Sequence, residues 1–251
     1  MTLTARKLVF FAGAVGLAAM LAFGVLELPP FGEYRGPYGD VIVERVERER
    51  KTLNAVAATA FDYRGVDTMG EEFILYAAVI GVALLLRAQR DETEQSPIDA
   101  ARDRRPPDTS DATRIVGLGS VGAAVTHAAY IITHGHLSPG GGFQGGVVAA
   151  TALIMVYLAG EFLTFDRLGP EKFVEPVEAV AAASYVLIGL AGLALGAAFL
   201  DNVVPLGRTG DLWSSGTILL LNVAVGLEVA AAFVLMSDEF LEQTLMVRRT
   251  R

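Results

Sequence analysis

The sequence of 251 residues contains no cysteine, and it has few histidines and one tryptophan. Without cysteine, the chain has no disulfides, thiolate nucleophiles, iron–sulfur clusters or cysteine-bound zinc. It also lacks an excess of basic residues, because 20 lysines and arginines stand against 28 acids, and this excludes a basic nucleic-acid-binding face. Only 19% of the residues are charged and 53% are hydrophobic, whereas a soluble domain has about 25% charged residues. The composition therefore predicts a membrane protein.

The hydrophobic residues form long runs that carry few charges. About 20 apolar residues in a helix cross a hydrocarbon core of about 30 Å, and the helix satisfies its own backbone groups there. The sequence therefore predicts an all-α, polytopic integral membrane protein with about six transmembrane helices. The segments are Leu8–Leu26, Phe73–Leu86, Ile115–Thr133, Val147–Leu163, Val177–Leu200 and Trp213–Met236. The second segment reaches full length only if its helix includes Gly70–Glu72.

The polar stretches indicate how the chain is divided. Residues 91–112 are charged and rich in proline, which is typical of a linker. They separate a two-helix unit, residues 1–90, from a four-helix unit, residues 113–240, which a tail of residues 241–251 follows. Between the first two spans, Val41–Ala60 has apolar residues at helical spacing, which indicates either an amphipathic helix at the membrane surface or a solvated charged helix.

Lysine and arginine indicate the orientation in the membrane. If the N-terminus is cytoplasmic, six spans place 13 of the 20 basic residues in cytoplasmic segments. Cytoplasmic loops are enriched in these residues. The sequence thus predicts a multi-pass protein of the cell membrane with both termini in the cytoplasm.

The third hydrophobic segment has polar residues on one face. Ser120, His127 and His134 recur every seven residues, and ionisable groups at this depth face a bundle interior, a partner or a water path. Because histidine titrates near neutral pH, His127 and His134 are candidates for a proton or ion path. The alternative is a structural histidine bonded to a carbonyl group. His134 and His136 lack further metal ligands at suitable spacing, so we expect no metal site and no cofactor.

Two groups of acidic residues are further candidates. Glu228 lies well inside the sixth segment, where a buried carboxyl group suits a carrier of protons or sodium; the alternative is an ion pair with another subunit. Asp62–Glu72 contains four acids next to the second segment. On physical grounds alone, this stretch indicates a solvated loop in which Thr68 or Asp67 caps the following helix.

A glycine-rich run joins the third and fourth segments. It formally contains G-x-G-x-x-G, but a nucleotide-binding fingerprint follows a strand, whereas this run connects two membrane segments. Its glycines allow a tight turn and a close approach of backbones, which predicts a structural loop. The loop residues are Pro139, Gly140, Gly141, Gly142, Phe143, Gly145 and Gly146.

These residues resemble a known family. The run from His134 to Gly146 is similar to the hallmark of the B subunit of Mrp-type (Mnh-type) multisubunit sodium/proton antiporters, and Thr113–Phe240 fits that subunit in length and number of spans. Asn54–Arg87, which contains Asp-Tyr-Arg-Gly-Val-Asp-Thr, resembles the last part of the large A subunit, with Tyr63 in place of the usual phenylalanine. The resemblance implies an A-subunit end fused to a B subunit.

The resemblance also implies a function. The chain would be a membrane subunit of a monovalent cation (Na⁺)/proton antiporter, with Asp67 and Glu71 as candidates for the cation route. Its partners would be the large A- and D-type proton-channel-like subunits, a small C-type subunit, Na⁺, H⁺ and lipid, but no nucleic acid. The alternative is a structural scaffold in an antiporter or in an assembly like complex I or the membrane-bound hydrogenases. No catalytic set is evident, so we predict no enzymatic activity.

Overall fold

The computed structural model describes residues 3–28, 30–33, 36–86, 109–159 and 173–246, and their regular structure is entirely helical. Five helices are long and apolar enough to cross a membrane, namely α1, α4, α7, α10 and α11, and α8 is a shorter apolar helix. The prediction of an all-α polytopic membrane protein is confirmed. The helices are α1 (Leu3–Leu26), α2 (Tyr38–Arg50), α3 (Ala55–Ala58), the π-helix η1 (Thr59–Tyr63), α4 (Gly65–Leu86), α7 (Asp111–Thr133), α8 (Gly142–Leu158), α10 (Glu175–Ala194) and α11 (Thr217–Met246).

The chain forms two compact units, residues 1–41 and residues 42–251. The first unit contains α1, whose 24 residues include the predicted segment Leu8–Leu26 and begin five residues before it. The second unit contains all the other membrane-spanning helices. Within it, α4 packs against both α11 and α10, so α4 belongs to the same bundle as the helices that follow the predicted linker.

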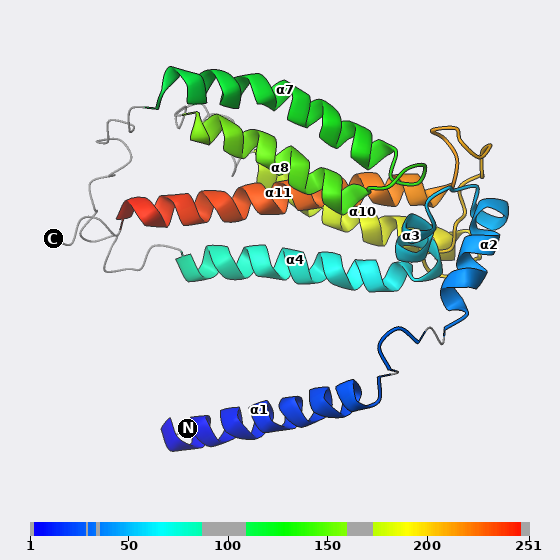
Figure 1. The fold of residues 1–251 in the computed structure, drawn as a ribbon, viewed down its shortest axis with the longest axis horizontal. Coiled ribbons are helices and arrows are strands. Elements are labelled where there is room, and N and C mark those ends of the chain that lie inside the picture. Colours follow the sequence, from blue (N-terminus) through cyan, green and yellow to red (C-terminus); the bar gives the residue numbers. More distant parts are fainter. Residues whose placement is uncertain (1–2, 29, 34–35, 87–108, 160–172, 247–251) are drawn as a thin grey trace. The chain divides into compact units, whose positions relative to one another are not determined.

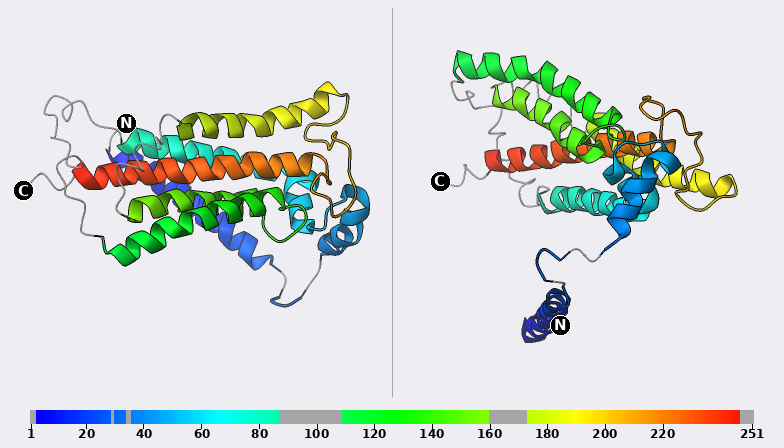
Figure 2. Two further views of the ribbon diagram at one scale, coloured as in Figure 1. Left: turned by 90° about the horizontal axis from the view of Figure 1, so that it is seen from above. Right: turned by 45° about the vertical axis from the view of Figure 1, so that its right-hand side comes forward.

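Helix α11 is the centre of the second unit. It packs against α8, α10 and α4, whereas α7 packs mainly against α8 (Figure 1). Within their membrane spans, 67% of the residues of α11 are buried but only 6% of those of α7. The left view in Figure 2 shows α11 between α10 and the α7–α8 pair. A polar side chain on α11 is therefore enclosed by protein.

The segment between the first two predicted spans is not one helix. The expected helix over Val41–Ala60 is wrong, because Lys51 adopts a φ of 53° and ends α2 there. Asn54 then caps α3, and its side-chain oxygen accepts hydrogen bonds from the backbone N–H groups of Val56 and Ala57. α3 and η1 continue into α4 after a break at Arg64, so capping of α4 by Thr68 or Asp67 is also wrong. The Thr68 hydroxyl instead donates to the Ala60 carbonyl at 2.7 Å.

Several helix ends differ from the predicted ones. α4 includes Gly70–Glu72, as its predicted length required. α10 ends at Ala194 and not at Leu200, because the chain turns back and the N–H of Leu200 donates to the carbonyl of Gly189 at 3.2 Å. α11 begins at Thr217 and not at Trp213. Parts of the predicted fourth span, the linker and the tail lie outside the described residues.

Candidate functional site

Three glutamates are buried inside the helical bundle. They are Glu72 of α4, Glu178 of α10 and Glu228 of α11, and their exposed fractions are 3%, 3% and 1%. Each lies on the buried face of its own apolar helix; Glu72, for example, shares that face of α4 with Thr68 and Val79. An ionised carboxylate without a partner is costly in such surroundings. The three acids, named the acid row below, are therefore the main electrostatic feature of the bundle.

Glu72 and Glu228 face each other across a small cavity of about 10 Å³. Each is the main charged neighbour of the other. Within the part of the chain that the structure describes, no N–H or hydroxyl group of another residue donates to their four carboxyl oxygens, and the two carboxyl groups are close enough to share a hydrogen bond with each other. The remaining lining residues are Met69, Phe73, Ala182, Tyr185 and Val186.

Glu178 extends the acid row along α10. It lies one helical turn before Ala182, which lines the cavity, and its carboxyl group interacts electrostatically with Glu228. On the other side of the cavity, the Tyr185 hydroxyl donates to the carbonyl of Gly65 at 2.8 Å. Tyr185 is itself buried, so it closes the cavity toward the end of the bundle where α2 and α3 lie.

The structure places only one of the acids predicted from the sequence in this row. Glu228 lines the cavity, but Asp67 and Glu71 are exposed on the surface of this chain, and Asp67 forms an ion pair with Arg64. Their place on a cation route stays a prediction. Glu72 and Glu178 were not predicted, although Glu72 is the immediate neighbour of Glu71.

The connection between α7 and α8 is hydrogen-bonded to the segment between α2 and α3. The carbonyl of His136 accepts hydrogen bonds from the N–H groups of Leu53 and Asn54, at 3.1 and 3.2 Å, and from the Thr52 hydroxyl. The Asn54 amide donates to the carbonyls of Gly135 and Ser138, at 2.7 and 3.0 Å. These bonds fix the loop at one end of the bundle.

A second set of contacts joins the same end of the bundle to the start of α11. The Arg50 guanidinium is paired with the Asp62 carboxylate at 2.6 Å, and the other oxygen of Asp62 accepts from the Asn202 amide at 3.0 Å. The Asn202 side chain in turn accepts from the N–H of Thr217 at 2.9 Å. Asp62 of the predicted acidic stretch therefore has a structural role.

The two histidines of the loop lie in different surroundings. The His136 side chain is fully buried, and burial lowers the pKa of its imidazole, an effect that the backbone groups of Asp211 and Leu212 offset only in part. His134 is half-buried, and its ring stacks on Tyr130 with the ring centroids 4.2 Å apart. Across the described ranges, no three histidine or acidic side chains are grouped as metal ligands would be.

The predicted structural loop ends at Gly141, because Gly142–Gly146 form the start of α8, and its glycines let α7, α8 and α11 approach closely. Gly140 has a φ of 135°, which favours glycine. The Asn222 side chain of α11 accepts from the N–H of Gly142 at 2.9 Å, and a Cβ at Gly142 would lie 2.4 Å from the Asn222 carbonyl oxygen. A Cβ at Gly146 would lie 2.7 Å from the carbonyl oxygen of Gly226. Of the other predicted loop residues, Gly141 and Gly145 are buried, whereas Pro139 and Phe143 are exposed and Phe143 contacts Phe233 edge to face.

The polar face of α7 points away from this bundle. His127 is exposed, and no hydrogen bond or ion pair to it is found within the described ranges. The hydroxyl of the neighbouring Thr126 is bonded to its own helix, at the carbonyl of Gly122. His127 therefore does not belong to the acid row within this chain, and its place on an ion path stays a prediction.

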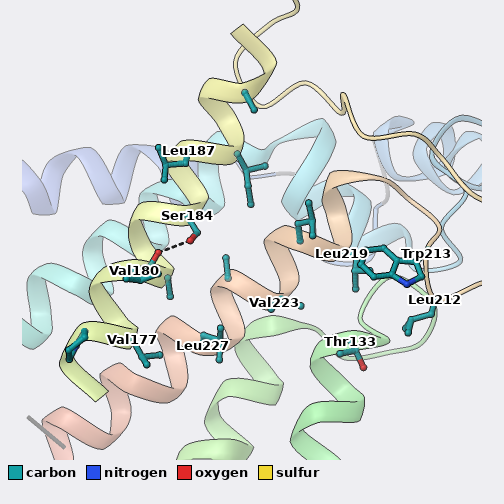
Figure 3. A pocket seen from close by; sticks show the side chains of 16 residues that line it. Thr133, Val177, Val180, Ser184, Leu187, Leu212, Trp213, Leu219, Val223 and Leu227 are labelled. Carbon is teal, nitrogen blue, oxygen red and sulfur yellow. Dashed lines mark hydrogen bonds between the residues drawn. The ribbon is translucent and has the colours of Figure 1, made fainter. Parts of the chain in front are cut away.

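A wide groove on the surface of the bundle is apolar. A groove of about 900 Å³ lies between α10 and α11, and Figure 3 shows Val180, Leu187, Leu219 and Val223 along it and Trp213 at one end. The hydroxyl of Ser184 in the groove is bonded to the carbonyl of Val180 at 2.6 Å. A groove with this lining offers nothing to a small ion, so the small cavity of the acid row is the better candidate site.

Comparisons with known proteins relate this bundle to antiporter subunits. Residues 112–235, which extend from α7 into α11, match the family described as a domain related to the MnhB subunit of the Na⁺/H⁺ antiporter. An uncharacterised protein of Methanocaldococcus jannaschii is 32% identical over 200 residues, which cover 71% of this chain and 73% of that protein. Residues 112–235 of the chain belong to the MnhB-related family. The resemblance seen in the loop His134–Gly146 is thereby confirmed.

Other MnhB relatives are named for cation/proton antiport. The chain is 31% identical to a protein of Rhizobium meliloti named as the probable A/B subunit of a K⁺/H⁺ antiporter, over 62% of this chain and 17% of that protein. It is 34% identical to the B subunit of the Na⁺/H⁺ antiporter of Bacillus subtilis, over 29% of this chain and 50% of that protein. The MnhB-related chain thus spans half or less of the length of these two antiporter proteins.

Two solved membrane complexes contain chains with the same fold. A chain of the membrane-bound sulfane sulfur reductase, an archaeal respiratory membrane complex, aligns with a TM-score of 0.70 and 29% identity over 94% of this chain and 98% of that chain. A chain of the Mrp complex from Dietzia sp. DQ12-45-1b aligns with a TM-score of 0.67 and 24% identity, over 95% of this chain and 26% of that one. Both relatives belong to multisubunit membrane assemblies.

Proposed function

We propose that this chain is a membrane subunit of a multisubunit antiporter that exchanges a monovalent cation for protons, and that the acid row forms part of its ion path. The observation that carries the proposal is the pair of buried carboxyl groups of Glu72 and Glu228, which have no hydrogen-bond donor in the described residues. Acids at such a depth are costly and serve ion or proton movement. The family of the MnhB-related domain and the names of the Rhizobium and Bacillus relatives support antiport.

The partners in this proposal are the other subunits of the antiporter, including the large A- and D-type subunits and the small C-type subunit. The match to part of a Rhizobium protein that is named for both the A and the B subunits supports the fusion of an A-subunit end with a B subunit. The relatives favour a transporter component over an enzyme. The chain lies in the cell membrane with both termini in the cytoplasm.

The test is cation/proton exchange by the whole complex in inverted membrane vesicles. The chain is expressed with its native neighbours, and the collapse of a proton gradient is followed by a pH-sensitive dye when Na⁺ or K⁺ is added. We expect exchange by the wild type, and its loss in Glu72→Gln and Glu228→Gln when the complex still assembles. Glu44→Gln on the exposed surface of α2 removes an equal charge outside the bundle and is the matched control. Normal exchange by both assembled cavity variants would contradict the assignment.

A second candidate function is supported by the respiratory relative. The match to the sulfane sulfur reductase complex covers 98% of the matched chain, more than any antiporter match reported above. The chain could thus serve as a membrane subunit of an assembly in which electron transfer drives ion movement. Purification of the chain with its neighbours separates the two: bound redox centres in the purified complex support the second function, and their absence together with exchange in vesicles supports the first.

A further inference from the structure

The cavity between Glu72 and Glu228 is much smaller than a hydrated cation. Its volume of about 10 Å³ leaves room for about one water molecule at most. We propose that this cavity carries protons and admits neither Na⁺ nor K⁺, so that the cation crosses the assembly by another route. This inference rests on the proposed function and deepens it by naming the ion that the acid row handles.

The lining of the cavity offers oxygen ligands to a bare cation on only part of its surface. A cation that leaves water has its hydration shell replaced by protein oxygens. Here the oxygens come from the two carboxyl groups and from the Tyr185 hydroxyl, whose proton is already donated to the Gly65 carbonyl. The other lining residues, Met69, Phe73, Ala182 and Val186, present hydrocarbon and sulfur. Oxygen ligands therefore reach only part of a cation placed between the two acids.

One proton is enough to remove the repulsion between the two acids, and the pair then carries a single negative charge. Two carboxylates that share a buried site repel each other, and the lining residues include no lysine, arginine or histidine. A proton shared by Glu72 and Glu228 removes the repulsion and gives a donor to oxygens that otherwise have no partner. A proton therefore satisfies the cavity as it stands, whereas Na⁺ requires it to expand.

The transfer step is balanced within the pair. The O–H bond of protonated Glu72 breaks, and a new O–H bond forms on the carboxylate of Glu228, directly or through one water molecule. Glu72 becomes the carboxylate and Glu228 becomes neutral, so the pair keeps one negative charge throughout. Glu178, one turn before Ala182 on α10, is the next acid that can receive the proton.

The first experiment is infrared difference spectroscopy on the purified complex. The carbonyl stretch of protonated carboxyl groups is recorded during a pH titration in choline chloride, and then during addition of NaCl or KCl at constant pH. We expect a band that titrates with pH, disappears in Glu228→Gln, persists in Glu44→Gln and does not change when either salt is added. If addition of Na⁺ or K⁺ removes this band in the wild type and causes no such change in Glu228→Gln, the inference is wrong.

A second variant tests the inference when glutamine disrupts assembly. Glu228→Asp keeps the charge but shortens the side chain by one methylene group, so the two carboxyl groups move apart. We expect a lower maximal exchange rate and a shifted pH profile, with an unchanged Na⁺ concentration for the half-maximal rate. If Glu228 binds Na⁺, this concentration rises and the pH profile stays in place, and the inference is then wrong.

Failure of the proposed function gives a different result from failure of the inference. In one outcome, the wild-type complex exchanges no cation, while the infrared band still titrates with pH and does not change when salt is added. In that case the antiport proposal is wrong, and proton transfer between Glu72 and Glu228 stands. If exchange is normal and Na⁺ or K⁺ displaces the proton, antiport stands and proton selectivity of this cavity is lost.

Discussion

At the scale of single residues, the close contact between the start of α8 and α11 depends on the absence of a side chain at Gly142. In Gly142→Ala the added Cβ would lie 2.4 Å from the Asn222 carbonyl oxygen, a backbone atom that cannot move aside alone. We expect a loss of stability of about 1–3 kcal/mol, the usual cost of overpacking. The measurement is thermal unfolding of the purified chain in detergent. Gly81→Ala in α4 is the control, because its Cβ would meet nothing within 4 Å, and equal melting temperatures for both variants would contradict the prediction.

The buried His136 predicts a pH dependence of stability. Burial lowers the pKa of its imidazole in the folded state, whereas in the unfolded chain the pKa is about 6.5. Between these two pKa values the unfolded state binds more protons, so stability rises with pH there and is lost as the pH falls below about 6.5. Melting temperatures from pH 8 to pH 5 test this. His136→Gln should flatten this part of the profile, and an unchanged slope in that variant would assign the effect to other groups.

At the scale of helices, the sequence sufficed for the class of the protein and for five of the six predicted spans, but not for the rotation of the helices. Apolar length alone predicts α1, α4, α7, α10 and α11, because a helix in lipid needs only length and hydrophobicity. Which face turns inward is decided by neighbouring helices. Helices in lipid pack through close contact and polar groups, so an apolar stripe does not tell which face of a helix turns toward its neighbours. Glu71 and Glu72 lie side by side in sequence, yet only Glu72 faces the bundle.

Ends of helices were predicted less well than their centres, for a related reason. The break at Lys51 is held by a distant part of the chain, because the Ser215 hydroxyl donates to the Lys51 carbonyl at 3.0 Å, and the early end of α10 depends on a turn in which the N–H of Leu200 donates back to Gly189. Local periodicity does not contain such contacts. A usable signal did exist for Glu72, since it follows Thr68 by four residues and so shares its face of α4.

The outward face of α7 predicts contact with a partner protein of the assembly. His127 is exposed on a membrane helix, where an imidazole without a hydrogen-bond partner is costly. We expect a transmembrane helix of another subunit to cover this face and to accept a hydrogen bond from His127.

Since the chain has no cysteine, Ala123→Cys introduces a unique site for a photoreactive maleimide on the same face. Illumination should cross-link the chain to a neighbouring subunit in the assembled complex and to none when the chain is expressed alone. Adducts with lipid alone in the assembled complex would show that the face lies in the bilayer.

At the scale of the whole molecule, the two ends of the acid row are chemically different. α4 and α11 run in the same direction from the end where α2, α3 and the α7–α8 loop meet (Figure 1). Tyr185 closes the cavity toward that end, and Glu178 lies on the side of the opposite end. A proton that enters the acid row from one end therefore meets Glu178 first, and a proton that enters from the other end meets Tyr185 first.

The distribution of basic residues predicts this orientation. Both termini in the cytoplasm place α2 and the α7–α8 loop outside the cell, because α4 crosses the membrane after α2. Glu44→Cys in α2 should then react with a membrane-impermeant maleimide added to intact cells, whereas Arg248→Cys should react only after the membrane is opened. Each variant is first shown to assemble with its neighbours. Labelling of Arg248→Cys in intact cells, with Glu44→Cys protected, would reverse the orientation and would place Glu178, not Tyr185, nearer the outside.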